Sequence, residues 1–399
     1  MKLAKLSLAA IVVASLSASA FAADSLAGAI KNGKVSGLLQ AYDFNTKSAG
    51  TSANIINLGV DLSYVTDSLY GISAGVTMQS TNSPWANAAA RTKFGGTMYG
   101  PGAVLSEAYL KYAINGFSIK AGRQYVGTPL VAGSGSRTTR QAFKGVIAGY
   151  TGVANTVIGA GYVTKYQKRT NGAGHIAQFG KYKDGAWTVY AKNHSVKGLK
   201  LLAAYAHAKG VTSVDDTNYF YTQADYSVKM SGANVGLGAQ YYNSSTGKTT
   251  NATSGDGSLF GVRVTAGLNG LSGYIGYNKN DNKSNTLVGI GSGTGDDYAH
   301  TFFYTEEAYR AGVKAWGIGL AYDLSKVGAK GFKVKGLYNT YSGANNIKYN
   351  LKSYGLGAYY SFAGTYKGLK TGLAYESINY GDTTTKDVNK MRFTIDYKF

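Results

Sequence analysis

The chain has 399 residues and no cysteine, and its 41 lysine and arginine residues outnumber 20 aspartate and glutamate residues, for a formal net charge of +21. Without cysteine, disulfides and thiolate chemistry are excluded, and the 4 histidines show no metal-ligand spacing. Because the basic residues are spread singly along the chain, the charge favours an anion-attracting field or anionic lipid over nucleic acid.

The first 22 residues have the features of a secretory signal peptide. Lys2 and Lys5 form a positively charged N-terminal region, and residues 6–16 form an apolar stretch. Ala20-Phe21-Ala22 is an A-x-A cleavage site. The apolar stretch is shorter than the roughly 20 residues that a membrane-spanning helix needs. We therefore predict that residues 1–22 are removed on export and that residues 23–399 form a single transmembrane domain.

The remaining chain alternates apolar and polar residues in short segments. Examples are 56–64, 262–266, 316–322 and 354–362, in which every second residue is apolar. A period of two indicates β-strands, and a closed barrel of strands satisfies every backbone hydrogen bond in lipid. The alternation also fits a soluble β-sandwich. Gly, Ser and Ala recur on the polar face, however, which favours a wide aqueous lumen over a packed core.

Turn signals and longer polar stretches separate the predicted strands. Short turns are predicted at Asp67-Ser68, Asn115-Gly116, Asp184-Gly185, Ser231-Gly232, Asn269-Gly270 and Lys367-Gly368. Long loops are predicted at 81–102, 125–142, 244–257, 279–311 and 342–348. This alternation is typical of an outer-membrane barrel with periplasmic turns and extracellular loops. About nineteen strands can be marked, and because such barrels have an even number, we predict 18 strands, with 16 as the alternative.

The final segment supports the same fold class. Residues 391–399 place Met, Phe, Ile, Tyr and Phe on one face and end on Phe399. An aromatic last residue after such alternation resembles the C-terminal signature of outer-membrane barrel proteins. We therefore predict an all-β, transmembrane antiparallel barrel in the bacterial outer membrane.

Four segments of the chain carry motifs that can be compared with known families. Residues 108–158 carry a Gly-Arg-Gln, a Thr-Pro, a basic loop and a Phe-x-Gly in that order, and residues 304–341 carry an Ala-Trp, a Tyr-Asp and a Gly-x-x-Gly turn. The other two segments are AIKNGKVSG near the start and RFTIDYKF at the end. Together these segments resemble the OprD-type outer-membrane porins of the Campylobacter and Helicobacter group, and the Campylobacter-type major porin is a related possibility.

The resemblance implies an 18-stranded barrel, often trimeric, with a loop folded into the lumen. It further implies passage of small solutes such as amino acids and other carboxylates along a ladder of basic side chains. The segment Gly317 to Asp323 departs from the family, because it has Gly at inward positions where the family tends to have Arg.

Because every second residue of a strand faces the same side, its position in this alternation, which we call its parity, predicts whether a charged side chain lines the pore. The basic candidates are Lys111, Lys120, Lys229, Arg263, Lys333, Lys335, Lys370, Arg392 and Lys398. The acidic candidates are Asp61, Glu107, Asp225, Asp323, Glu376 and Asp396. Because nine basic residues face six acidic residues, we predict an electric field in the pore that moderately favours anions. Charged constrictions set the ion selectivity of a channel. The alternative is that these charges only pair with one another.

A constriction is predicted in the basic loop 125–142. Arg137 and Arg140, folded inward, would narrow the pore and bind carboxylate or phosphate. The alternative is an outer loop that contacts lipopolysaccharide. Arg123 is included in the predicted constriction, although it shares parity with Phe117 and should face lipid unless a bulge turns it inward.

The sequence therefore predicts a passive porin for ions and small hydrophilic solutes, without a cofactor or metal and with no enzymatic activity. Its expected partners are outer-membrane lipid, lipopolysaccharide and two further copies of the chain in a homotrimer. The alternative function is a structural or adhesive barrel whose long loops bind external partners.

Overall fold

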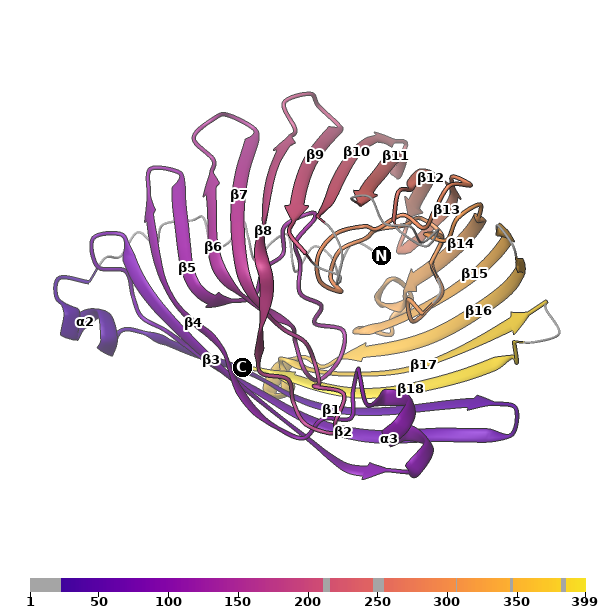
Figure 1. The fold of residues 1–399 in the computed structure, drawn as a ribbon, viewed down its shortest axis with the longest axis horizontal. Coiled ribbons are helices and arrows are strands. Elements are labelled where there is room, and N and C mark those ends of the chain that lie inside the picture. The colour runs from indigo at the N-terminus through magenta and orange to yellow at the C-terminus, as the bar shows by residue number, and fades with distance from the viewer. Residues whose placement is uncertain (1–22, 211–215, 247–254, 306, 345–346, 382–384) are drawn as a thin grey trace.

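The computed structural model describes residues 23–210, 216–246, 255–305, 307–344, 347–381 and 385–399. The predicted signal peptide, residues 1–22, lies outside the described residues. The described chain forms one antiparallel sheet of 18 strands that curves into a ring (Figure 1). Each strand pairs with its neighbours in the chain, and β1 pairs with β18 from Leu38↔Lys398 to Ser48↔Val388, which closes the barrel. The predicted count of 18 strands is confirmed.

The element bounds are as follows. The strands are β1 Lys34–Ser48, β2 Thr51–Val65, β3 Ile72–Ala86, β4 Gly102–Ile114, β5 Phe117–Gln124, β6 Ala142–Tyr150, β7 Thr156–Gln167, β8 Phe179–Asn193, β9 Leu199–Ala208, β10 Thr217–Met230, β11 Ala233–Thr246, β12 Ser258–Leu268, β13 Leu271–Asn280, β14 Lys314–Asp323, β15 Phe332–Ala344, β16 Ile347–Ser361, β17 Leu369–Tyr380 and β18 Val388–Lys398. The helices are α2 Leu26–Lys31 and α3 Ala88–Phe94, with short 3-10 turns η1 Leu324–Val327 and η2 Gly364–Tyr366.

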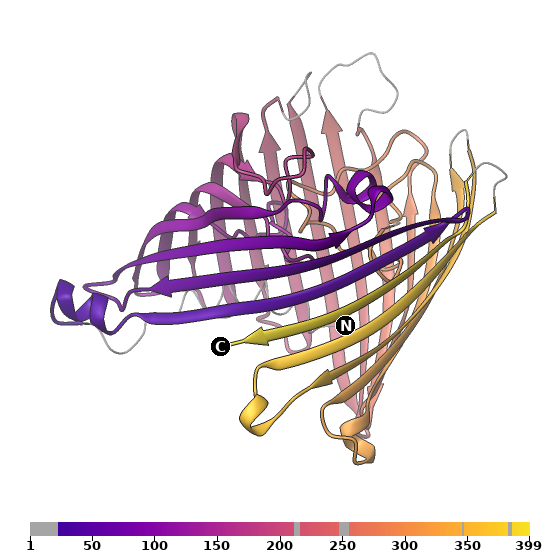
Figure 2. The ribbon, with the colours of Figure 1, turned by 90° about the horizontal axis from the view of Figure 1, so that it is seen from below.

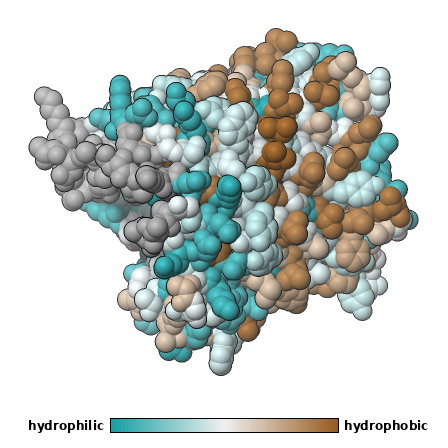
Figure 3. Space-filling view, turned by 90° about the vertical axis from the view of Figure 1, so that its right-hand side faces the viewer, coloured by the Kyte–Doolittle hydropathy of each residue, from teal (hydrophilic) through white to brown (hydrophobic). Residues whose placement is uncertain are grey.

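The outer face of the barrel is apolar. On β14, Trp316, Ile318 and Leu320 are about half exposed, whereas Ala315, on the opposite face of the same strand, is fully buried. Figure 3 shows apolar side chains gathered in a broad patch on one side of the barrel. Exposed apolar residues at every second position are what a lipid-facing strand requires, because the hydrocarbon solvates them. The predicted strand faces are therefore confirmed on this strand.

Short turns and long loops alternate along the chain. The predicted hairpin turns at Asn115-Gly116, Ser231-Gly232 and Asn269-Gly270 are present, each with two consecutive residues at positive φ. These torsions match the type I′ geometry that suits twisted hairpins. The strands tilt strongly, so that those at the front of Figure 2 cross those behind at a large angle. Tilt of this kind accompanies barrel closure.

The turn predicted at Asp184-Gly185 is wrong. The strand β8 runs through both residues, and its register with β7 shifts between Val163 and Lys165. Gly185 has a φ of +85°. A bulge uses the same glycine torsion as a turn, so that the dipeptide alone does not distinguish the two.

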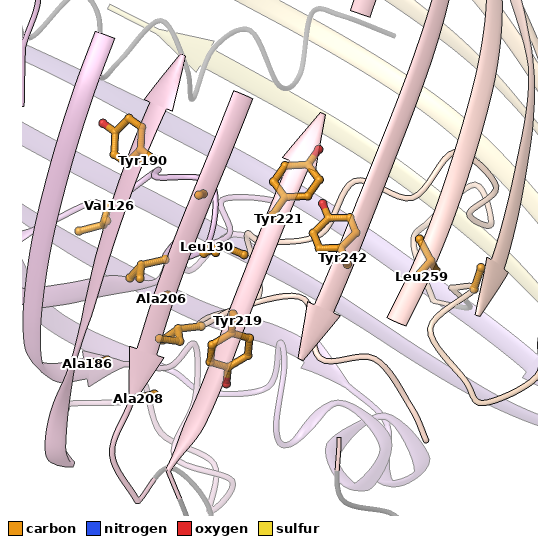
Figure 4. Close-up of a cluster of buried hydrophobic side chains, with 14 of the residues drawn as sticks. Val126, Leu130, Ala186, Tyr190, Ala206, Ala208, Tyr219, Tyr221, Tyr242 and Leu259 are labelled. Atoms are coloured by element: carbon orange, nitrogen blue, oxygen red, sulfur yellow. The ribbon is translucent and has the colours of Figure 1, made fainter. Parts of the chain in front are cut away.

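The interior is filled in part by side chains and loops. One buried cluster joins inward residues of β6–β12 and β14–β17 to the loops 125–141 and 281–313. Figure 4 shows part of this cluster and labels Tyr221 and Tyr242. The rings of this pair stack at 4.1 Å between centroids. A second cluster joins Phe44 and Ile55 to α3 and to Phe303. Among the described residues, no helix is long and apolar enough to cross a membrane.

Phe143 is expected to be a major stabilising contact of the first cluster. Its side chain is fully buried and stacks on Tyr166 at 4.6 Å. Phe143→Ala is expected to lower the free energy of unfolding by about 3–5 kcal/mol, because it leaves a cavity. Urea titration in detergent micelles measures the change. The control is Phe220→Ala, whose ring is 40% exposed on the outer face, and an equal loss in both variants would contradict the assignment.

Candidate functional site

The loop 125–141 leaves the barrel wall after β5 and packs on the inner side of β2 and β3. The amide of Asn57 donates to Thr138 Oγ1 at 3.3 Å. The backbone N–H of Arg140 donates to Gln79 Oε1 at 2.7 Å, and Gln79 Nε2 donates back to the Arg140 carbonyl at 2.9 Å. Asn57 and Gln79 are buried inward side chains, so the end of this loop is fixed by paired hydrogen bonds.

The loop 281–313 meets the first loop inside the ring, where the magenta and orange segments of Figure 1 lie. The N–H of Ile290 donates to the Leu130 carbonyl at 2.8 Å, and the N–H of Ala132 donates to the Ile290 carbonyl at 2.9 Å. The side chain of Gln141 adds a contact to Ser292 at 3.1 Å. Two loops far apart in sequence therefore hold each other through a short parallel β-bridge between Val131 and Ile290.

Small residues on the inner wall make room for the loop 281–313. A Cβ on Gly276 would lie 2.2 Å from the carbonyl oxygen of Tyr298, and one on Gly355 would lie 2.4 Å from Phe302 Cβ. A Cβ on Gly317 would lie 3.1 Å from the backbone of Ala299. The glycine at position 317, where the sequence departs from the family pattern, thus lies directly beneath this loop.

The far end of the loop 281–313 is held by a buried ion pair. Lys390 Nζ lies 3.5 Å from Glu376 Oε2 and donates to Thr305 Oγ1 at 2.5 Å. The N–H of Phe303 donates to Glu376 Oε1 at 3.3 Å. Glu376, a pore-lining candidate by parity, is fully buried beneath the loop and anchors it.

Six of the predicted charged residues form three ion pairs with one another. Arg140 lies 3.8 Å from Asp61, Lys120 lies 3.1 Å from Glu107, and Arg263 lies 3.5 Å from Asp225. The Arg140 guanidinium also lies 3.8 Å from the centre of the Tyr125 ring, and that of Arg263 lies 4.1 Å from the centre of the Tyr298 ring. For these residues the structure supports the mutual pairing that the sequence left open.

Three further cations lie over aromatic rings, and a fourth, Arg169, lies beside one of them. We call these three arginines and one lysine, Arg137, Arg169, Lys335 and Arg392, the arginine cluster. Arg137 and Arg392 each lie 5.8 Å from the centre of the Tyr42 ring. Arg392 also lies 4.6 Å from the Phe303 ring, and Lys335 lies 4.3 Å from the Phe302 ring. No member forms an ion pair with any residue in the described ranges.

Arg169 joins this cluster from the loop 168–178. Its Nη2 donates to Ser136 Oγ at 3.2 Å, beside Arg137. Burial, together with the charge of Arg137, lowers the pKa of Arg169 to about 10. The guanidinium of Arg169 therefore keeps its charge at neutral pH and adds to the positive charge of the cluster. Sequence reasoning missed Arg169, because strand parity does not place a loop residue.

Other predicted pore residues lie elsewhere. Lys333 and Asp323 pair with each other at 3.6 Å at the short-turn end, where Asp323 also caps η1. Lys370 is in register with Asp396 near the same end, and Lys111 is in register with Lys120.

Arg123 does not join the predicted constriction. It is in register with Lys144 on β6, and the adjacent Phe143 points inward, so that Lys144 and Arg123 lie on the outer face. Its guanidinium lies 4.9 Å from the centre of the Phe179 ring, and its Nη1 donates to the Leu105 carbonyl at 3.2 Å. The assignment to the constriction is therefore wrong, and the parity of Arg123 was the correct guide, because no bulge reverses it within β5.

A family model for the outer membrane porins of the OprD family matches residues 102–399. The chain is a member of the OprD family. No significant match was found among curated protein sequences. The match covers every strand from β4 onward and both inward loops, whereas β2 and β3, on which the loop 125–141 packs, precede it.

Solved structures share the fold at low sequence identity. OccK8 (OprE) of Pseudomonas aeruginosa aligns with a TM-score of 0.77 at 16% identity over 93% of this chain and 99% of that chain. OccAB3 of Acinetobacter baumannii aligns with a TM-score of 0.79 at 14% identity over 93% and 100%. OpdK of P. aeruginosa, solved with vanillate, aligns with a TM-score of 0.78 at 14% identity over the same shares.

Family membership settles the general function. As an OprD-family porin, the protein is a passive substrate channel in the bacterial outer membrane and is not an enzyme. Within the described residues, no group of three or more His, Asp or Glu side chains is arranged to hold a metal ion.

Proposed function

We propose that this porin favours small anions, in particular small carboxylates such as amino acids and aromatic acids, and passes them between the loops 125–141 and 281–313. The observation that carries the proposal is the arginine cluster. Two guanidinium groups and one ammonium group lie over aromatic rings, and the Arg169 guanidinium donates to Ser136 beside them. None of the four forms an ion pair with a carboxylate in the described residues. A permeating anion supplies the missing partner.

The charge balance around the loops supports this direction of selectivity. Arg140, Lys120 and Arg263 each have a carboxylate nearby, so these pairs largely cancel. The arginine cluster, in contrast, has no ion-paired carboxylate within the described ranges. Arginine binds carboxylates through two parallel hydrogen bonds, and charged constrictions select ions by sign. The aromatic rings beside Arg392 and Lys335 offer apolar contact to the body of an organic acid.

The relatives offer support by analogy. OpdK, which has the same fold, was solved with vanillate, an aromatic carboxylate. A ligand of that class would place its carboxylate on guanidinium groups and its ring against Phe303 or Tyr42. We extend this class of solute to the present chain as part of the proposal.

The test is planar-bilayer recording under a potassium chloride gradient. The reversal potential is expected to have the sign of chloride permeation, and benzoate is expected to reduce the chloride current at millimolar concentration. Benzyl alcohol, which has the same ring without the charge, is the matched control. Cation selectivity, or equal effects of benzoate and benzyl alcohol, would overturn the proposal.

Several assignments stay predictions. We propose that the two loops form the constriction and that Lys111, Lys333 and Lys370 line the wider pore. We also propose removal of residues 1–22 on export, a homotrimer in contact with lipopolysaccharide, and kinship with porins of the Campylobacter and Helicobacter group. Native mass spectrometry of the purified protein measures the number of copies and the mass of the exported chain.

A further inference from the structure

Four basic residues form a straight row across the outside of the barrel. Arg123 on β5 is in register with Lys144 on β6, Lys144 with Lys165 on β7, and Lys165 with Lys181 on β8. We call these four residues the basic row. Directly paired residues of neighbouring strands lie on the same face of a sheet, at about 4.8 Å per strand, so the row covers roughly 14 Å of surface.

The row faces outward. Its immediate neighbours in the strands, Phe143, Tyr166 and Tyr182, point inward, where Phe143 stacks on Tyr166 and Tyr166 contacts Tyr182. Side chains alternate between the two faces of a strand. The four strands β5–β8 stand side by side in Figure 1, and the row crosses all of them.

The row lies at the outer-leaflet end of the barrel. Each of its members is one or two residues from the strand end that leads into a long loop, either 125–141 or 168–178. Tyr162 and Trp187, which are in register on the same outer face, lie further into the strands and are about half exposed. Aromatic side chains of this kind mark the membrane interface. The basic row is therefore at the level of the lipid headgroups.

Among the described residues, the basic row has no acidic partner that would compensate its charge. Like charges directly opposite each other destabilise a sheet. No Asp or Glu occurs in the sequence between Glu107 and Asp184, and no member of the row forms an ion pair with a described residue. Glu107 itself is on the inner face, paired with Lys120. An anion from outside the chain is what would balance the row.

We propose that the basic row binds the phosphate groups of a phosphorylated glycolipid of the outer leaflet, that is, the lipid A part of lipopolysaccharide. The phosphates would lie along the row and the acyl chains would descend past Tyr162 and Trp187. This site is on the outer face and is independent of the arginine cluster inside the barrel. Its failure would leave the proposed anion preference untouched.

The test uses full-length exported protein in phosphatidylcholine nanodiscs that contain diphosphoryl lipid A. Native mass spectrometry after exchange into detergent counts the lipid A molecules retained. Replacing Arg123, Lys144, Lys165 and Lys181 by Gln is expected to reduce retention at least roughly tenfold, because each basic residue near an anionic surface contributes to binding. The control variant carries Gln at Lys197, Lys326, Lys330 and Lys367, which removes the same charge from exposed short turns.

Two results would overturn the proposal. One is equal retention of lipid A by the wild type and the basic-row variant. The other is equal retention of lipid A and of the same lipid with its phosphates removed, which would show acyl-chain packing alone. Circular dichroism and heat-modifiable gel migration establish that the variant is folded. A basic-row variant that does not fold is replaced by the two double variants, Arg123→Gln with Lys144→Gln and Lys165→Gln with Lys181→Gln.

Discussion

Replacing Arg137, Arg169 and Arg392 together by glutamine is expected to abolish the anion preference of the channel. These three guanidinium groups lie around Tyr42, Ser136 and Phe303 with no ion-paired partner in the described chain, so that their charge acts on permeating ions. The reversal potential under a salt gradient is expected to fall to near zero or to change sign. Block by benzoate is expected to disappear at the same time.

The matched control removes three positive charges from the short turns. Lys326, Lys330 and Lys367 are exposed there, away from the two inward loops, and glutamine at these positions is expected to leave the reversal potential close to that of the wild type. An unchanged reversal potential in the arginine variant would contradict the proposal. So would an equal shift in the two variants, because a general loss of net charge would then explain the result.

The second large effect is expected from Gly276→Val on β13. A Cβ at this position would lie 2.2 Å from the backbone oxygen of Tyr298, a contact that cannot be relieved by turning a flexible side chain. The loop 281–313 must therefore move away from the wall. Single-channel conductance is expected to rise severalfold, and anion selectivity to weaken, if this loop narrows the pore as proposed.

A glycine on the neighbouring strand provides the control. Gly267 on β12 shares parity with Arg263 and faces inward, and its added Cβ would make only an ordinary contact, with Leu271 O at 3.5 Å. Gly267→Val is therefore expected to keep the wild-type conductance. A folded Gly276→Val channel with unchanged conductance would show that the loop does not limit the flow of ions.

Both predictions depend on loops, and loops are where the sequence was least informative. Strand parity correctly predicted which residues of β14 face outward. It also assigned Arg263, Lys335 and Arg392 to the inner wall of the barrel. It had no means to place Arg169 or Phe303, because a loop has no fixed period. The turn predicted at Asp184-Gly185 was wrong for a related reason, since a bulge and a turn need the same glycine torsion.

The sequence alone determined the β-strands and the hairpins between them, because a period of two and turn dipeptides are local properties that do not depend on tertiary contacts. The even strand number that is typical of outer-membrane barrels then favoured 18 strands. The sequence also determined the excess of positive charge. Only the tertiary structure decided how that charge is divided. The loops 125–141 and 281–313 pair through Leu130 and Ile290, which are 160 residues apart. In the folded chain, some cations are neutralised by carboxylates inside the barrel and others lie around Tyr42 without an ion pair among the described residues. Four more form the basic row on the outer face. Contacts between such distant residues depend on the closed ring that brings them together, and no local pattern encodes them.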